Sequence, residues 1–181
     1  MKIKDMSSML KIDHGNYQTS FEKIAQNIFN TFKLNINGEL FLPIEIEFYY
    51  YSEHHKDMKT LKRTSKVGDL FFHDYGIDLC FESDGKNQYG GILLRSIKSI
   101  ADENFINGPL KVTQAIMNKI KVNESFIISY DQSDLQSRSL TKYKRIISAN
   151  TDNHYIEKPY RFAIEIDNPK NKVKYKTKTL K

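Results

Sequence analysis

Two carboxylates alternate with apolar residues in the segment IEIEFYYY, residues 44–51. Side chains of a β-strand point alternately to its two faces, so Glu45, Glu47, Tyr49 and Tyr51 share one face and the residues between them share the other. Taken alone, the alternation is typical of a half-buried strand with a solvated polar face. The alternative is an aromatic pocket with a carboxylate in its floor, placed to act as a general acid or base.

Histidines follow this strand closely. His54 and His55 precede Asp57, and His73 precedes Asp74. These residue types are ligands of zinc or iron, so a metal-dependent hydrolase that uses His54, His55 and His73 is one alternative. Adjacent residues of an extended segment point apart, however, and no two histidines are four residues apart. We therefore expect neither a metal nor another cofactor.

The composition is that of a soluble globular protein. At 181 residues with 39% hydrophobic content, the chain is long enough for one domain with a sizeable core. No apolar run approaches the length of a membrane helix, and the N-terminus lacks the apolar segment of a signal peptide. The single cysteine, Cys80, lies in an apolar run and cannot form an internal disulfide. These features predict a cytoplasmic protein with no membrane partner.

The net charge is +6, and lysines are concentrated in residues 168–181. A basic balance attracts polyanions, of which nucleic acid is the first candidate. A lysine-rich solvated surface would give the same count, so charge alone does not decide between the two.

The elements that would position the carboxylates can be read from the periodicity. Residues 19–33 have apolar side chains at spacings of three and four, and Thr19 with Glu22 resembles a capping box, which predicts a helix. A turn at residues 35–38 leads to the strand that contains Glu47, and residues 54–66 form a charged loop. Residues 69–82 and 91–97 predict two strands joined by a turn at residues 83–90.

The remaining chain predicts a helix at residues 110–120 after Gly108 and Pro109, a polar loop at 131–141, and strands at 126–128, 161–166 and 173–175. Because the strands are joined by short reversals, the pattern indicates a single α+β domain built on an antiparallel sheet.

Six short patterns occur in a specific order between residues 21 and 175. They are Glu45-Ile46-Glu47-Phe48-Tyr49, a histidine in the next loop, Tyr75-Gly76 followed by Cys80, Leu93-Leu94-Arg95, Gly108-Pro109-Leu110-Lys111 with Gln114-Ala115, and Lys158-Pro159-Tyr160-Arg161-Phe162. In this order and at these spacings, the chain resembles the alkyladenine (3-methyladenine) DNA glycosylase family.

The resemblance implies a curved antiparallel sheet, open and barrel-like, with flanking helices and a protruding hairpin. Residues 19–181 would form this domain, and residues 1–18 an extension of unknown role. The implied activity is that of a monomeric, monofunctional, cofactor-free enzyme that binds double-stranded DNA containing damaged purines. It flips out an alkylated or deaminated purine and hydrolyses its N-glycosidic bond with a carboxylate-activated water.

Residue by residue, the resemblance implies that Glu47 is the general base and that Tyr49 stacks on the flipped base. Arg95 matches an arginine near the reacting water and the backbone phosphate, where a charge-assisted contact would suit it. Tyr75 matches a tyrosine on a hairpin that wedges into the minor groove and fills the gap left by the flipped base. Without the resemblance, Glu47 reads as a solvated carboxylate, Tyr75 as a core residue and Arg95 as a surface ion-pair partner.

Three further pocket positions depart from the family pattern. Either His54 or His55 would match the pocket histidine, and His73 falls where the family has a second stacking tyrosine. Glu82 stands where the family has an asparagine that helps to reject undamaged guanine. The family's Thr-Pro-Arg-Asn segment is reduced here to Arg63-Thr64. The shortened loop and Glu82 favour an alternative function, a module of the same fold that binds nucleic acid with little or no hydrolysis.

Overall fold

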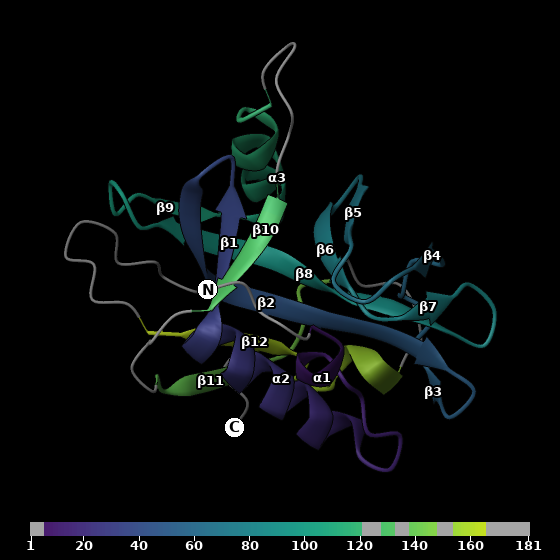
Figure 1. Cartoon of the computed structure of the whole chain (residues 1–181). Coiled ribbons are helices and arrows are strands. Elements are labelled where there is room, and N and C mark those ends of the chain that lie inside the picture. The colour runs from purple at the N-terminus through teal and green to yellow at the C-terminus, as the bar shows by residue number, and fades with distance from the viewer. Residues whose placement is uncertain (1–5, 121–127, 133–137, 148–153, 166–181) are drawn as a thin grey trace.

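An antiparallel sheet built around two long strands organises the chain. The computed structural model describes residues 6–120, 128–132, 138–147 and 154–165, with backbone alone for 128–132. Strand β2 (Glu39–Ser52) pairs along its length with β8 (Gln88–Ser99), and the two run side by side through the molecule (Figure 1). The fold is a single α+β domain whose mostly antiparallel sheet does not close into a barrel, which confirms the predicted class.

The other strands extend the sheet on both sides of this pair. The strand order is β10-β1-β2-β8-β6-β5. In addition, β12 and β3 pair with β2, β9 pairs with β8, and β11 pairs with β12. The bounds are β1 Phe32–Ile36, β3 His55–Lys56, β5 Leu70–His73, β6 Gly76–Cys80, β9 Phe105–Asn107, β10 Ile128–Gln132, β11 Leu140–Tyr143 and β12 Arg161–Ile164. The short strands β4 (Thr64–Ser65) and β7 (Ser83–Asp84) form a separate pair.

Two helices lie on opposite sides of the central strands, α2 (Tyr17–Thr31) on one side and α3 (Pro109–Met117) on the other (Figure 1). Helix α2 buries an apolar stripe against β2, where Phe21 stacks on Phe48 with ring centroids 4.6 Å apart. Its cap differs from the prediction. The side chain of Asn16 accepts a hydrogen bond from the Thr19 backbone N–H at 3.0 Å, so the helix begins before the predicted capping box.

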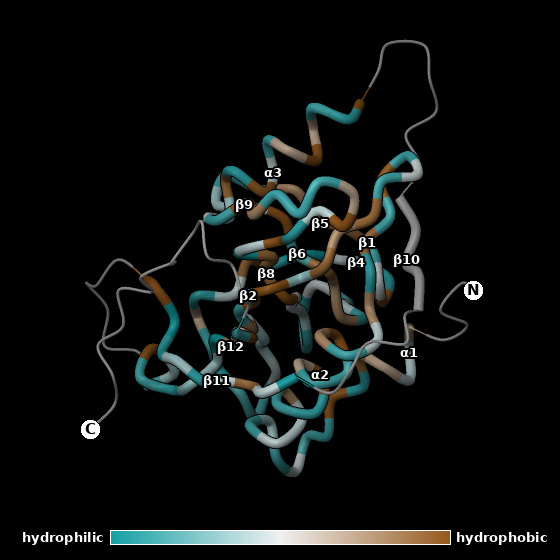
Figure 2. The backbone as a smooth tube through the Cα atoms, turned by 90° about the vertical axis from the view of Figure 1, so that its left-hand side faces the viewer, coloured by the Kyte–Doolittle hydropathy of each residue, from teal (hydrophilic) through white to brown (hydrophobic). Residues whose placement is uncertain are grey.

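The N-terminal segment packs on this core. Helix α1 (Met6–Met9) leads to Leu10, which is 3% exposed and belongs to the main hydrophobic cluster. The boundary expected between residues 18 and 19 falls inside α2. The hydrophobic stretches of the backbone gather in the interior around β2, β6 and β8, and the hydrophilic ones lie on the outer turns (Figure 2). No described helix is long and apolar enough to cross a membrane.

The predicted strand at residues 69–82 is a hairpin. Strands β5 and β6 pair with His73 opposite Gly76, and the chain reverses at Asp74 and Tyr75. Gly76 has φ +149°, and a Cβ there would lie 2.7 Å from Leu93 Cδ1 and 3.0 Å from Pro109 Cβ. Glycine therefore lets the hairpin tip stand against the start of α3.

The other predicted elements are found with shifted ends. The reversal at residues 83–90 joins β6 to its antiparallel neighbour β8, as predicted. The polar loop at 131–141 instead holds the end of β10 and the start of β11, and the charged loop at 54–66 holds β3 and β4. The short 3₁₀ helix His154–Ile156 precedes β12. The strand predicted at 173–175 lies outside the described residues.

Candidate functional site

A cavity of about 570 Å³ opens beside β2, between the β5–β6 hairpin and the start of α3. This volume is in the usual range for small-molecule pockets. Its walls come from β2, β6, β8 and α3, from the loop after β3, and from the segment after β11. The lining residues are Tyr49, Met58, Lys59, Thr60, Leu61, Arg63, His73, Asp74, Tyr75, Asp78, Leu93, Arg95, Pro109, Leu110, Ile146 and Ile147.

Apolar side chains stand exposed around the mouth of this cavity. Among the described residues, the four most exposed large hydrophobic side chains all line it: Met58, Tyr75, Leu110 and Ile146, with exposures of 73, 67, 59 and 56%. Exposed apolar side chains gathered at one place mark interaction surfaces, because leaving them in water costs free energy. The cavity is therefore the strongest candidate for a binding site.

Glu47 lies directly behind the wall of the cavity. Its carboxylate is 0% exposed and accepts hydrogen bonds from the Tyr49 hydroxyl at 2.9 Å and the Ile146 backbone N–H at 2.8 Å, and Arg95 Nη1 lies 3.2 Å away. All three partners line the cavity. The solvated-face interpretation is therefore wrong for Glu47. Burial raises the pKa of this carboxyl, against the opposing effect of Arg95.

Glu45 extends the same network away from the cavity. It is 3% exposed and pairs with Arg95 Nε at 3.1 Å and Arg161 Nη1 at 3.0 Å, and it accepts from the Ser96 hydroxyl at 3.1 Å. Arg95 therefore bridges both carboxylates from β8, and its side chain is only 13% exposed. The interpretation of Arg95 as a surface ion-pair partner is wrong.

Tyr49 separates Glu47 from the cavity. Its phenol is held as a hydrogen-bond donor, since burial and the adjacent Glu47 carboxylate both raise the pKa of Tyr49. The guanidinium of Arg145 lies over its ring, with Cζ 4.6 Å from the centroid. Arg145 is itself held by Asp57, 2.6 Å away, and by the carbonyl of Phe48 at 3.1 Å. Tyr49 therefore has a fixed position between the carboxylate and the cavity.

A second polar group lies at the base of the hairpin. Arg63 Nη1 and Asp78 Oδ2 are 2.6 Å apart, and His73 Nε2 is 3.2 Å from Asp78 Oδ1. The guanidinium of Arg63 stacks on the ring of Phe71, with Cζ 4.4 Å from the centroid. A Cβ at Gly91 would lie 2.9 Å from Asp78 Cβ and 3.1 Å from Arg63 Nη1. The bare backbone of β8 at this glycine leaves the room that the ion pair occupies.

Tyr75 stands at the tip of the hairpin and at the edge of the cavity. Its 67% exposure shows that the interpretation as a core residue is wrong. The structure thus brings together Glu47, Tyr49, Arg95, His73 and Tyr75 at one cavity. It does not place the other three predicted residues there.

His55 lies on the opposite side of β2. Its Nδ1 donates to the Tyr50 carbonyl at 2.7 Å, and its Nε2 accepts from the Tyr160 hydroxyl at 3.0 Å. Burial lowers the pKa of His55, which favours the neutral ring that this pattern needs. His55 is thus a satisfied core residue, because the turn into β3 directs it onto the apolar face. His54 is exposed to solvent.

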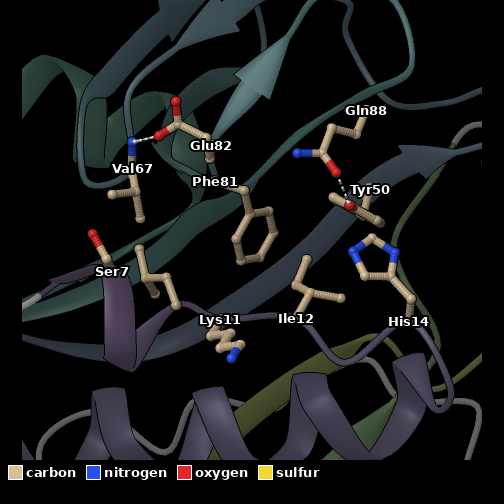
Figure 3. Close-up of a pocket in the computed structure, with 10 residues that line it drawn as sticks. Ser7, Lys11, Ile12, His14, Tyr50, Val67, Phe81, Glu82 and Gln88 are labelled. Carbon is tan, nitrogen blue, oxygen red and sulfur yellow. Dashed lines mark hydrogen bonds between the residues drawn. The ribbon is translucent and has the colours of Figure 1, made fainter.

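Glu82 lines a second pocket of about 300 Å³, shown in Figure 3. Its carboxylate accepts from the Val67 backbone N–H at 3.1 Å, and the ring of Phe81 points into the space beside it. Ser7, Lys11, Ile12 and His14 of the N-terminal segment form the opposite wall. Glu82 follows the end of β6 and lines this pocket, not the larger cavity.

The histidines do not gather around a common point. Within the described parts of the chain, no three side chains of His, Cys, Asp or Glu are close enough to hold a metal ion together. His54, His55 and His73 therefore do not form the cluster that the metal-dependent hydrolase alternative requires.

Asp78 and Arg145 are among the residues of the site that the sequence analysis did not predict. Asp78 sits in the apolar run GIDLC of β6, and a charged residue in a fully buried strand is itself a signal of a buried partner. Arg145 lies in a segment with no periodic pattern, and nothing in the sequence indicated its contact with Tyr49.

Comparison with known proteins adds one relative and no family. No family model matches the chain. It is similar to an uncharacterized protein, L759, of Acanthamoeba polyphaga mimivirus, with 26% identity over 203 aligned positions that cover 89% of this chain and 91% of the relative. The similarity spans nearly the whole length of both proteins, and the relative's name carries no activity.

Proposed function

We propose that the chain is a DNA glycosylase that hydrolyses the N-glycosidic bond of a flipped-out damaged purine. The observation that carries the proposal is the position of Glu47 behind a cavity whose mouth bears Tyr75 and three other exposed apolar side chains. A base must leave its stack to be excised, and it then needs an apolar pocket with a proton acceptor at its floor.

Glu47 supplies the proton acceptor in this proposal. Burial raises its pKa, which makes the ionised carboxylate a stronger base than an exposed glutamate. The groups that contact the Glu47 carboxylate are Tyr49, Ile146 and Arg95, which also line the cavity, and Arg161. In this proposal a bound substrate displaces the Tyr49 side chain, which opens Glu47 Oε2 to a water. Catalytic hydrogen bonds commonly reach their final geometry only when substrate is bound.

Tyr49, His73 and Tyr75 supply the flat surfaces that a flipped nucleotide needs. Tyr49 and His73 line the wall, where either ring can stack on a base. Tyr75 is exposed at the hairpin tip, so it can enter the duplex where the base has left. Met58, Leu110 and Ile146 would cover the sugar edge around the opening, and Lys59 adds a cation for the backbone phosphates.

A second candidate is a module that binds a flipped or single-stranded base without hydrolysis. It is favoured by one observation, the enclosure of Glu47, which is 0% exposed with both oxygens engaged. The two candidates share the pocket and differ only in whether Glu47 can reach a water.

Excision assays separate them. Duplexes that carry hypoxanthine, ethenoadenine or a methylated purine are incubated with excess protein, and released base is measured. Glu47→Gln should keep DNA binding and lose at least ~100-fold in single-turnover excision, the scale of a general base. Glu39→Gln is the matched control, since Glu39 lies on the same strand, is exposed and pairs with Lys119. Binding without release of any base by the wild-type protein would establish the second candidate instead.

A further inference from the structure

The pairing between β2 and β8 is irregular at Glu45. Ile46 pairs with Leu94 and Glu45 pairs with Ser96, so the ladder skips Arg95. Adjacent residues of a regular strand point to opposite faces. Here Arg95 Nε and the Ser96 hydroxyl both reach the Glu45 carboxylate, at 3.1 Å each. Bulges re-aim side chains in this way and are frequent beside active sites. The irregularity therefore brings two consecutive residues of β8 to one buried carboxylate.

Glu45 fixes how Arg95 meets Glu47. Its Oε1 lies 3.1 Å from Arg95 Nε and 3.0 Å from Arg161 Nη1. A guanidinium is planar and rigid, so a contact that holds Nε also sets the direction of Nη1. Arg95 Nη1 lies 3.2 Å from Glu47 Oε2. The position of the Glu45 carboxylate is thus transmitted to Glu47 through one rigid group.

Glu45 also balances the charge around Glu47. Arg161 Nε is 4.0 Å from Glu47 Oε1, so two guanidinium groups approach this carboxylate. Glu45 contacts both of them, and its charge cancels one. Without Glu45, two buried cations would stabilise the ionised Glu47 and make it a weaker base. The charged and titratable groups around Glu47 are Arg95 of β8, Arg161 of β12, Tyr49 of β2, Arg145 over the Tyr49 ring, and Asp78 of β6 beyond Leu93.

We propose that Glu45 is the positioning residue for Glu47. It aims Arg95 at the Glu47 carboxylate and cancels one of the two positive charges that would otherwise hold that carboxylate too firmly. The inference rests on the proposed function for the role of Glu47 as a base. Glu45 is not one of the residues that line the cavity, so it acts through the two arginines and not on the substrate.

Glu45→Gln tests the charge. It keeps the size of the side chain and removes its negative charge, so Glu47 should titrate about 1 pH unit lower than in the wild type. Carbon-13 NMR of the side-chain carboxyl groups measures this titration without DNA or catalysis. Glu39→Gln is the matched control, because Glu39 is exposed on the same strand and pairs with Lys119, and it should leave the Glu47 titration in place. A Glu47 titration at or above the wild-type value in Glu45→Gln would overturn the proposal.

The same variant tests the effect on the reaction. Single-turnover excision should fall ~10- to 100-fold, because small displacements of a catalytic group cost rates on this scale. The DNA concentration that gives half the maximal rate should change less than ~3-fold, since substrate binding is not involved. The acid limb of the pH profile should move down with the Glu47 titration. A lower melting temperature with an unmoved pH profile would show that Glu45 is only structural.

Glu45→Asp keeps the test decisive if Glu45→Gln does not fold. It retains a negative partner for the buried arginines but draws the carboxylate back by one methylene. The Arg95 Nε–H should then exchange with solvent at least ~10-fold faster, as expected for a lost hydrogen bond. Excision should fall ~10-fold while the acid limb stays near its wild-type position. Excision at the wild-type rate, or unchanged exchange where no excision occurs, would reject the positioning role.

The outcomes also separate this role from the proposed activity. A lowered Glu47 titration in Glu45→Gln, with no excision of any duplex lesion by the wild type, would reject the glycosylase and leave the coupling of Glu45 to Glu47 standing. Excision by the wild type with a Glu47 titration that does not respond to Glu45→Gln would reject the positioning role alone.

Discussion

Replacement of Tyr75 by alanine should affect catalysis on duplex DNA far more than it affects folding. Truncating a fully buried aromatic side chain costs about 3–5 kcal/mol. Tyr75 is 67% exposed, so about a third of that cost applies, roughly 1–1.5 kcal/mol. For a chain of this length, such a loss lowers the melting temperature by roughly 2–6 °C.

The effect on duplex substrate has a different origin. Unstacking and unpairing a base costs a few kcal/mol, and a side chain that fills the gap offsets part of it. An offset of about 1.4–2.8 kcal/mol corresponds to a ~10- to 100-fold loss of single-turnover excision in Tyr75→Ala. A single-stranded substrate, or a lesion that is already unpaired, needs less help, so the loss should shrink to a few-fold there.

The assay compares both substrates and the thermal unfolding of the same variant. Phe72→Ala is the matched control, because Phe72 lies on the same hairpin, is 39% exposed and does not line the cavity. It should leave the ratio of duplex to single-strand excision unchanged. Equal impairment of Tyr75→Ala on both substrates would refute the wedge role, and a stability loss above about 3 kcal/mol would refute the burial argument.

Two other outcomes are expected. Asp57→Asn should lower the free energy of unfolding by roughly 3–5 kcal/mol, because it leaves the buried Arg145 guanidinium without its ion-pair partner. Urea denaturation measures this loss, and a change below about 1 kcal/mol would contradict the prediction. Because burial raises the pKa of Glu47, excision should fall as pH drops through a value above 4.5, the ordinary value for this side chain. The native state also keeps the Glu47 proton to higher pH than the unfolded chain does. The stability that the protonated carboxyl contributes is therefore lost as pH rises through the raised pKa. Glu47→Gln has no such proton to lose, so it should gain stability relative to the wild type over that pH window. Parallel pH profiles of the two proteins would contradict the raised pKa.

Periodicity predicted the elements well where one face of a segment is apolar. The helix at residues 19–33 and the strand around Glu47 were found close to their predicted places, since the apolar residues at their spacings decide which face is buried. The cap of α2 was missed because Asn16 lies outside the apolar pattern, whereas Thr19 is a residue type that commonly caps helices and has Glu22 three positions later. In the structure, Asn16 is the cap and the Thr19 backbone N–H donates to it.

The hairpin at Tyr75 shows where sequence patterns fail. Residues 69–82 read as one strand because apolar residues occur on both sides of the turn, and the reversal depends on Gly76 with its positive φ. The site was predicted in part for a similar reason. Alternation placed Glu47 and Tyr49 on one face, but only the tertiary structure shows that Arg95 and Ile146 cover that face.

Whether His54 or His55 faces the core depends on the length of the turn between β2 and β3, which the residue types do not reveal. His55 follows a strand that ends beside the core, so its ring turns inward to the Tyr50 carbonyl, and one residue of difference in the turn would have exposed it instead. The interaction of Arg63 with Asp78 joins residues 15 positions apart in different strands and loops, which no local pattern encodes.

The buried polar side of the sheet also constrains how this protein can change in evolution. Behind and around the cavity, the described residues include four carboxylates, Glu45, Glu47, Asp57 and Asp78, opposed by four guanidinium groups, Arg63, Arg95, Arg145 and Arg161. Their formal charges cancel in a largely buried region, so loss of any one member leaves a charge without its partner. Lysine cannot replace these arginines freely, because each guanidinium contacts two or more groups at once. Substitutions in this layer must therefore occur as matched pairs, and an alignment of relatives should show these eight positions varying together rather than singly.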